Sequence, residues 1–419
     1  MASEVLSKTS AAGKPEQRLQ RRVSEIAAEP GMKDALSWFR RNRHWVNEKH
    51  LELCRVPSAT FFEQKRAEWM TEQLREQGWE ARIDRAGNVI AYPDSVRDGP
   101  FIALTAHLDT VLAPRTREEI RTGAEGRFHG PGVADNGAGL AALLAVAACW
   151  IQEQPVIAPG ASLLLVANVG EEGEGNLSGM RFLCRQPVSQ KIRSFLVLDG
   201  PGTDHITCRA LASRRFEITF GGPGGHSWSD YGNANPVHAL SRAIHLFTEE
   251  YFRGGYEAAP RSSFNFGLID GGVSVNSIPA SAMAKVDLRS EDPERLEELA
   301  RALTGVVESA METENGRATG GKLVAKMREI GSRPGGVLAH NAHILPFLRA
   351  VDAHLGIRSH LDCASTDANV PLSMGMEAIS IGAGGQGGGA HTAEEWFDPE
   401  GRDLGLRRIL LALALLLSN

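Results

Sequence analysis

Apolar residues recur along the chain first at helical spacing and then in short runs. From about residue 34 to residue 78 the spacing predicts two helices, and Gly78 fits the end of the second. The runs EARIDRAGNVIAY, FIALTAHLD and SLLLVANVG then predict strands, and the strongly apolar stretch 137–154 predicts a helix. This alternation predicts an α/β domain with a mainly parallel sheet flanked by helices.

A different pattern begins near Ser213. Four strand-like runs, RRFEITF, FNFGLIDGG, AMAKVDLRS and KLVAKMREI, enclose helices expected at about 235–251 and 293–312. This β-α-β-β-α-β series predicts a two-layer, ferredoxin-like α+β domain inserted into the first. Beyond residues 334–336 the α/β pattern resumes with a helix at 338–355, the strand AISIGAG and a closing helix. We therefore expect a flexible leader at 1–30, a discontinuous main domain at 31–212 and 333–419, and an insert at 213–332.

Composition narrows the class of protein. The 419 residues are 42% hydrophobic and 23% charged, which suffices to bury a core in each of two domains. The net charge of −6 comes from interspersed acidic and basic residues, so neither a nucleic acid nor an anionic membrane is expected as a partner. The apolar run 409–417 is too short to span a bilayer and predicts a packed C-terminal helix, and the polar first 30 residues lack the apolar core of a signal peptide.

The five cysteines are odd in number, scattered and without a CxxC pair. This usage predicts neither a disulfide framework nor a thiolate zinc site. A reducing compartment, the cytoplasm, is therefore the expected location.

Five short segments, far apart in the sequence, each carry a side chain that can bind a metal ion. They are TAHLDTV with His107, GPGVADNGAG with Asp135, NVGEEGEG with Glu171 and Glu172, LVLDG with Asp199, and GGGAHTAEEW with His391. Two imidazoles and several carboxylates are the ligand mixture of a two-zinc hydrolase.

His107 and Asp109 lie two residues apart at the end of an expected strand, so both side chains point to one face of the sheet. Asp109 can then orient the imidazole of His107 as a supporting hydrogen-bond partner. Strand C-termini are the places where sites form in open α/β sheets. The alternative is a buried core histidine that is hydrogen-bonded to Asp109.

The other segments also have structural alternatives. Asp135 precedes an apolar helix and fits an N-cap, although the glycines around it allow the backbone to approach a metal cluster closely. Adjacent Glu171 and Glu172 would repel each other unless a metal or other partners balance their charge, and the alternative is an exposed acidic loop. Asp199 fits a cap as well, and His391 follows the glycine-rich stretch 384–389, whose backbone can wrap a substrate.

The order of these segments resembles the peptidase T, carboxypeptidase G and acetylornithine deacetylase family of dizinc metallopeptidases. The motifs HLDTV, GPGVADN, GEEG, GGHS, NSIP, VDLRS and AHTAEEW follow the family's order from about Leu51 to the C-terminus. The resemblance implies two Zn²⁺ ions per subunit, with Co²⁺ or Mn²⁺ as substitutes. It implies that Asp135 bridges the ions, that His107 and Asp199 complete one site and that Glu172 and His391 complete the other.

The same resemblance assigns roles outside the metal ligands. Glu171 is the general base, and His226 in GGPGGHSW is an oxyanion donor that reaches the site of a partner subunit. Asn276 and Arg289 bind the substrate's carboxylate, with alternatives as a turn residue and a surface ion-pair partner. Gly384 belongs to the substrate-binding glycine-rich stretch. The insert at 213–332 is then a homodimerisation domain.

Three features depart from the family's usual pattern. Trp228, Ser229, Asp230 and Tyr231 follow the GGHS motif where the family shows a small residue and a proline close behind. Asn136 stands where a second acidic residue is common, and Asp199 stands where some members have glutamate. These departures leave every ligand in place but predict a different loop after His226.

The leading hypothesis is a dizinc hydrolase that cleaves an amide bond in a small peptide or an N-acyl amino acid. The runner-up is a monomeric zinc aminopeptidase of a related family, against which the insert with its GGHS and DLRS motifs argues. A third hypothesis, from a different class, is a non-catalytic binding homologue of the same fold.

Overall fold

The computed structural model describes residues 13–93, 99–155 and 160–419, and it divides into two compact units. Unit 1 contains the chain up to Arg209 and from Val337 onward, and unit 2 is Ala210–Gly336. These bounds lie within four residues of the expected insert at 213–332.

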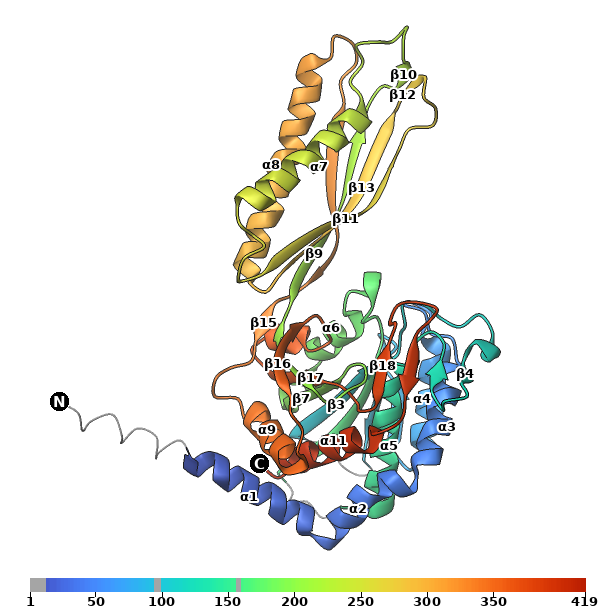
Figure 1. Cartoon of the computed structure of the whole chain (residues 1–419), viewed down its shortest axis with the longest axis vertical. Coiled ribbons are helices and arrows are strands. Elements are labelled where there is room, and N and C mark those ends of the chain that lie inside the picture. Colours follow the sequence, from blue (N-terminus) through green and yellow to red (C-terminus); the bar gives the residue numbers. More distant parts are fainter. Residues whose placement is uncertain (1–12, 94–98, 156–159) are drawn as a thin grey trace, which may run out of the picture. The chain divides into compact units, whose positions relative to one another are not determined.

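A nine-stranded sheet forms the centre of unit 1 (Figure 1). Its order is β1 (Glu80–Ile83), β2 (Val89–Tyr92), β6 (Ser162–Asn168), β3 (Phe101–His107), β7 (Ile192–Leu198), β17 (Glu377–Ile381), β8 (His205–Ala210) and β15 (Gly336–Val337), with β16 (His360–Ala364) paired to β8. The four central strands β6, β3, β7 and β17 are parallel, whereas β1, β2 and β8 pair antiparallel with their neighbours. The predicted parallel sheet is therefore present in the middle of a mixed sheet.

Helices flank this sheet. They are α2 (Pro30–Arg41), α3 (Arg43–Cys54), α4 (Gln64–Glu76), α5 (Gly137–Glu153), α6 (Ser178–Arg185), α9 (Ile344–Leu355), α10 (Asn369–Ser373) and α11 (Arg402–Leu417). Helix α5 is buried over nearly all of its length, and so is the apolar α11. No helix in the described ranges has the length and apolar character needed to cross a membrane.

Two sequence expectations about helices were wrong. The stretch 34–78 holds three helices, because Asn42 leaves the helical backbone with φ −104° and ψ 17° and so separates α2 from α3. Helix α9 begins at Ile344 and not at residue 338. At this observed start, the carboxylate of Glu377 accepts hydrogen bonds from the amides of His343 and Ile344. A cap that is supplied by a distant strand leaves no local signal in the sequence.

Helix α1 (Gly13–Ala28) occupies most of the region that was expected to be a flexible leader, and that expectation is wrong for residues 13–28. Val23 is fully buried, and the guanidinium of Arg22 donates to the carbonyl and the hydroxyl of Ser418 over 2.7 and 2.8 Å. Leu19, Val23 and Ile26 recur at helical spacing, so the signal for this helix was present. Residues 1–12 lie outside the described residues.

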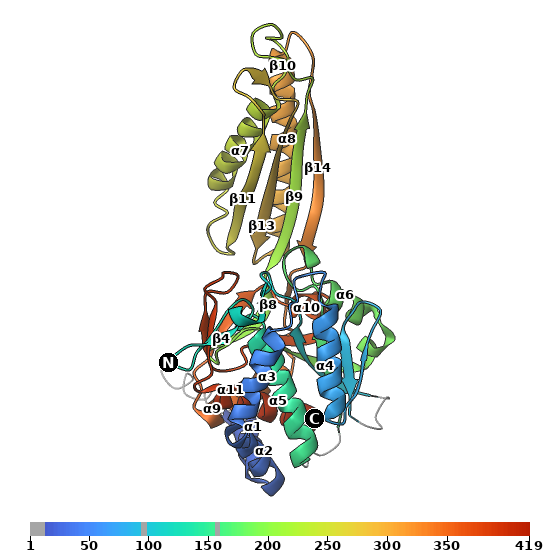
Figure 2. The same cartoon turned by 90° about the vertical axis from the view of Figure 1, so that its right-hand side faces the viewer.

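Unit 2 has the expected β-α-β-β-α-β order (Figure 2). Its elements are β9 (Ala212–Gly221), α7 (Pro236–Arg253), β11 (Ser262–Gly271), β13 (Ser281–Ser290), α8 (Pro293–Arg317) and β14 (Val324–Arg333). The antiparallel sheet has the order β11-β13-β9-β14, and alternate residues of β13 are buried in a core shared with α7 and α8. A two-residue ribbon of β10 (Gly225–His226) and β12 (Ser277–Ile278) lies beyond one end of this sheet.

Candidate metal centre

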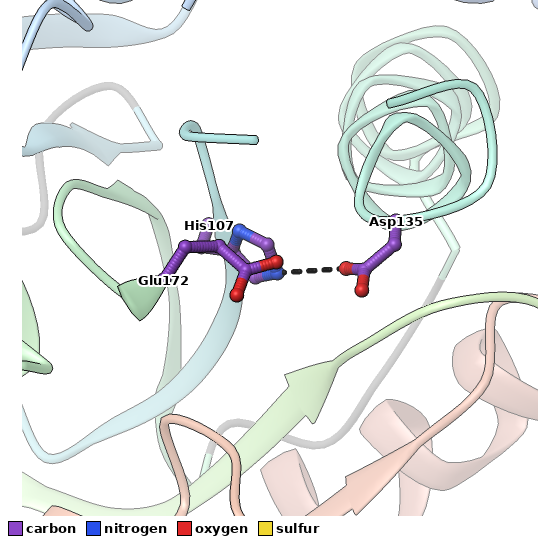
Figure 3. Close-up of side chains that lie close together, drawn as sticks. All are labelled: His107, Asp135 and Glu172. Carbon is purple, nitrogen blue, oxygen red and sulfur yellow. Dashed lines mark ion pairs between the residues drawn. The ribbon is translucent and has the colours of Figure 1, made fainter. Parts of the chain in front are cut away.

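The predicted ligands of unit 1 converge at the C-terminal edge of the parallel strands. His107 is the last residue of β3, Glu172 lies in the loop after β6, and Asp199 directly follows β7. Asp135 precedes α5, and His391 lies in the connection between β18 (Gln386–Gly388) and β19 (Trp396–Asp398). Figure 3 shows how His107, Asp135 and Glu172 approach one another from these different elements.

The carboxylate of Asp135 stands between the two imidazoles. Its Oδ1 lies 3.2 Å from Nε2 of His107, and its Oδ2 lies 3.2 Å from Nε2 of His391. Asp199 approaches His107 on one side, with 3.8 Å between Oδ1 and Nε2, and Glu172 approaches His391 on the other, with 2.9 Å between Oε1 and Nε2. The five side chains thus form two half-sites that share Asp135.

The donor atoms fit a divalent metal ion. One ligand atom each from His107, Asp135 and Glu172 lies within 4.8 Å of the others. Nε2 of His107 and Oδ1 of Asp135 are buried, and apart from their ion pair with each other neither makes a hydrogen bond of regular geometry with a described residue. Buried polar atoms normally make hydrogen bonds, so two such atoms without a regular hydrogen bond, close to a further carboxylate, indicate a ligand site. Imidazole nitrogens and carboxylate oxygens are ligands that zinc accepts.

Protons balance the charge of this cluster when no cation does so. Hydrogen bonds to Asp135 and Glu172 raise the pKa of His391 to about 10. Burial lowers the pKa of His107, but its contacts with Asp109, Asp135 and Asp199 outweigh burial and hold that pKa well above its usual value. Burial likewise raises the pKa of Asp135, and the two imidazoles outweigh it and lower that pKa below the usual range. A divalent cation therefore competes with these protons for the same atoms.

Asn136, and not Asp135, caps helix α5. Its Oδ1 accepts hydrogen bonds from the amides of Gly139 and Gly200, both over 3.1 Å, and its Nδ2 donates to the carbonyl of Leu198 over 2.8 Å. An ionised aspartate at this position would have no N–H to donate to the carbonyl of Leu198, so this contact depends on the amide of Asn136. Because Asn136 holds the residues on both sides of Asp199, it fixes that ligand beside Asp135.

Asp109 contacts four neighbouring residues, and its closest contact with His107 is through the backbone. His107 Nδ1 lies 2.9 Å from the backbone carbonyl of Asp109 and 3.6 Å from its carboxylate. The carboxylate instead accepts the amides of Glu171 and Glu172 over 3.0 and 2.9 Å and the hydroxyl of Thr60 over 2.9 Å. Asp109 thus orients the imidazole through its backbone and fixes the two glutamates through its side chain.

Glu395 is a supporting residue that sequence reasoning missed. Its buried carboxylate accepts the backbone amides of Gly132, Ala134 and Asp135 over 2.7, 2.7 and 2.8 Å. Glu395 follows His391 by four residues, so one loop supplies a ligand and also fixes the segment that carries the shared carboxylate. The only sequence signal was its place in the AHTAEEW motif.

Gly384 has a different environment from the one expected. The glycine is buried, its amide donates to the carbonyl of Gly202, and its carbonyl accepts the amide of Gly202. A Cβ at this position would lie 2.7 Å from the carbonyl oxygen of Arg402 and 2.9 Å from the Cα of Gly405 in α11. The geometry favours a role in packing α11 for Gly384 over contact with a substrate.

Two of the predicted residues come together in unit 2. His226 pairs with Ser277 in the β10–β12 ribbon, and the carbonyl of Asn276 accepts the amide of Ser227 over 2.9 Å. The Nδ1 of the exposed His226 accepts the amides of Trp228 and Ser229 over 3.2 and 3.3 Å. A neutral ring then carries its proton on Nε2, which makes that nitrogen a hydrogen-bond donor.

Arg289 lies apart from this pair. It sits near the end of β13 that is remote from the ribbon, where its Nε donates to Asp287 over 2.7 Å. Eight residues of strand separate it from Ser281, a rise of roughly 26 Å. Asn276 and Arg289 were both expected to bind the substrate's carboxylate. This separation is too large for the two residues of one subunit to bind the same carboxylate.

Two family models match overlapping parts of the chain. A family model described as the peptidase dimerisation domain matches residues 212–315, and one described as peptidase family M28 matches residues 88–224. A tripeptidase structure from Staphylococcus aureus covers 89% of this chain and 98% of its own at a TM-score of 0.71, with 20% identity. At that identity the likeness concerns the fold alone.

Curated relatives match over part of their length. A probable carboxypeptidase of Aspergillus terreus is 29% identical over 266 residues, which are 57% of this chain and 59% of that protein. A succinyl-diaminopimelate desuccinylase of Granulibacter bethesdensis is 26% identical over 269 residues, 61% of this chain and 69% of its own. This chain thus spans about three-fifths of the length of the carboxypeptidase.

The α/β main unit, the inserted unit and the order of the motifs agree with one another and with the family models. Together they confirm the chain's resemblance to the peptidase T, carboxypeptidase G and acetylornithine deacetylase family of metallopeptidases.

Proposed function

We propose that the protein is a dizinc hydrolase that cleaves an amide bond in a small peptide or an N-acyl amino acid. One observation carries the proposal: the carboxylate of Asp135 faces an imidazole on each side, with Asp199 and Glu172 completing the two half-sites. His107, Asp135 and Asp199 would hold one ion, and Asp135, Glu172 and His391 the other. When bound, such ions supply Lewis acidity, which acidifies water and polarises an amide carbonyl.

Glu171 is the proposed general base. It lies three residues after the end of β6, it is buried, and Asp109 fixes its backbone amide beside that of the ligand Glu172. Glu171 takes a proton from the attacking water and returns it to the departing nitrogen. Adjacent residues in extended backbone point in different directions, so this pair can divide the two tasks.

Unit 2 supplies the proposed oxyanion donor and the dimer interface. The Nε2 proton of His226 suits donation to the oxygen of a tetrahedral intermediate. We propose that unit 2 forms a two-fold dimer and that His226, with Asn276 beside it, serves the site of the partner subunit. The exposed Trp228 and Tyr231 in the same loop would accompany His226 to that site. Arg289 lies near the end of β13 that is remote from His226 and Asn276. Its planar guanidinium suits a carboxylate, and we propose that it contacts the carboxylate of the substrate.

A panel of dipeptides, tripeptides and N-acetyl amino acids tests the activity directly, with the protein loaded with zinc. We expect turnover of at least one class, which chelation abolishes and zinc restores. Turnover of peptides with a free amino terminus by a strict monomer would favour the rival monomeric aminopeptidase. Tight binding of these compounds without turnover would favour the non-catalytic homologue.

Metal stoichiometry should follow the two half-sites. We expect two ions per wild-type chain, ~3.5–4 Å apart as in other cocatalytic centres. His391→Ala removes a ligand of one half-site and should leave one ion, whereas Asp135→Ala should reduce the content below one. Inductively coupled plasma mass spectrometry of the dialysed proteins measures both. A fully loaded wild type with a single ion per chain would contradict the shared role of Asp135.

Glu395→Gln should lower the affinity for zinc by roughly 10–100-fold, the usual effect of removing a residue that orients metal ligands. The amide keeps the size of the side chain but replaces one acceptor oxygen with a donor that faces backbone N–H groups. Zinc titration against a competing chelator provides the measurement. Glu394→Gln is a matched control, because the neighbouring Glu394 is exposed. Equal affinities of the two variants would show that Glu395 does not position Asp135.

A further inference from the structure

Large apolar side chains are exposed on two loops of unit 1. Phe61 and Phe62 are 64% and 76% exposed, and Val111 and Leu112 are 43% and 42% exposed. We refer to these four residues as the apolar rim. Only three other large apolar side chains of unit 1 are exposed among the residues described, namely Val337, Leu361 and Met374. The exposure is therefore concentrated and calls for an explanation.

The two loops form one structure. Ala59 and Thr110 make an isolated parallel β-bridge, and the amide of Thr110 donates to the carbonyl of Ser58 over 2.9 Å. The amide of Phe62 donates to the carbonyl of Ala59 over 2.8 Å and closes a tight turn. The four residues of the apolar rim thus lie on two loops that a common set of backbone hydrogen bonds holds side by side.

This structure is fastened to the candidate metal centre. The hydroxyl of Thr60 donates to the carboxylate of Asp109, which also accepts the amides of Glu171 and Glu172. Val111 and Leu112 follow Asp109 by two and three residues. One carboxylate therefore joins the turn that carries Phe61 and Phe62 to the proposed general base and to a metal ligand.

The backbone of Phe61 is held in an unfavourable conformation. Its φ is +73°, a region that residues with a Cβ rarely adopt. Phe61 is 64% exposed, so burial of its ring does little to offset this cost. Strained backbone concentrates at binding and catalytic sites, where the surrounding structure maintains it.

We propose that the apolar rim is the subsite for a large apolar side chain of the substrate, such as leucine or phenylalanine, next to the scissile amide. The inference rests on the proposed hydrolase function and narrows its substrate class. Four side chains are too few for a stable protein interface, which buries about 1,200–2,000 Å² in total. They are enough to cover one amino-acid side chain beside the groups that act on its amide bond.

The test compares substrates that differ in one side chain. Leucine and serine versions of X-Gly, Gly-X and N-acetyl-X substrates are assayed with the zinc-loaded full-length protein. We expect Phe62→Ala and Leu112→Ala to lower kcat/KM for the leucine substrate by about tenfold, with little change for serine. Phe61→Gly should act in the same way while suiting the positive φ. Leu361→Ala is the matched control, because Leu361 is 45% exposed and lies outside the two loops.

Equal effects on the leucine and serine substrates, or no effect on either, would overturn the subsite while leaving the hydrolase in place. A wild type that turns over no member of the panel would overturn the proposed function. In that case, calorimetric binding of the same peptides to the zinc-loaded Glu171→Gln variant, with and without Phe62→Ala, decides about the subsite. A leucine preference that Phe62→Ala abolishes supports it, and no preference or no binding contradicts it. A changed sedimentation coefficient of Phe62→Ala would also contradict it, because a partner subunit would then cover the rim.

Discussion

Glu171→Gln is expected to lower kcat by about 10²–10⁴ while leaving the zinc content near that of the wild type. The substitution removes a proton acceptor but no proposed ligand, and glutamine keeps the volume of the buried side chain. Steady-state kinetics combined with metal analysis of the same preparation separates the two effects. A loss of kcat with an intact centre is the signature of a general base.

Two glutamates in the same loop provide the controls for this prediction. Glu172→Gln should lose zinc, because Glu172 lies 2.9 Å from His391 in one half-site. Glu174→Gln should leave both kcat and zinc content close to those of the wild type, since Glu174 is exposed. If Glu171→Gln loses zinc and Glu172→Gln retains it, the roles of the pair are reversed.

The sequence predicted most elements because their signals are local. The apolar helix α5 and the alternating strand β13 each follow the periodicity of their type. The sheet edges and the start of α9 could not be foreseen in this way, because strand pairing and the cap from Glu377 depend on distant residues. A local pattern specifies an element but not its partner.

The same distinction applies to the candidate site. His107, Asp135 and Asp199 lie at strand ends or at a helix start, where sequence position already indicates a site. The contact of Glu395 with the amides around Asp135 joins residues about 260 positions apart. The distance between Asn276 and Arg289 likewise follows from strand direction in unit 2 and not from their 13-residue spacing.

His226→Ala should lower kcat by about 10²–10³ with zinc retained, the range for the loss of one oxyanion-hole donor. The physical reason is the Nε2 proton, which the amides of Trp228 and Ser229 enforce by occupying Nδ1. His238→Ala is a suitable control, since His238 is an exposed histidine at the start of α7 in the same unit. Equal kinetics of the two variants would show that His226 has no part in the reaction.

Subunit mixing decides whether His226 acts across a dimer interface. Sedimentation analysis should first show a homodimer that deletion of unit 2 converts to a monomer. His226→Ala and Glu171→Gln chains, each nearly inactive alone, are then allowed to exchange subunits. One site of the heterodimer combines an intact Glu171 with an intact His226 from the partner, so activity should recover toward a quarter of the wild-type level when exchange is random. Heterodimers without recovered turnover would place His226 in its own subunit's site or outside the reaction, and a fully active monomer would exclude any role in trans.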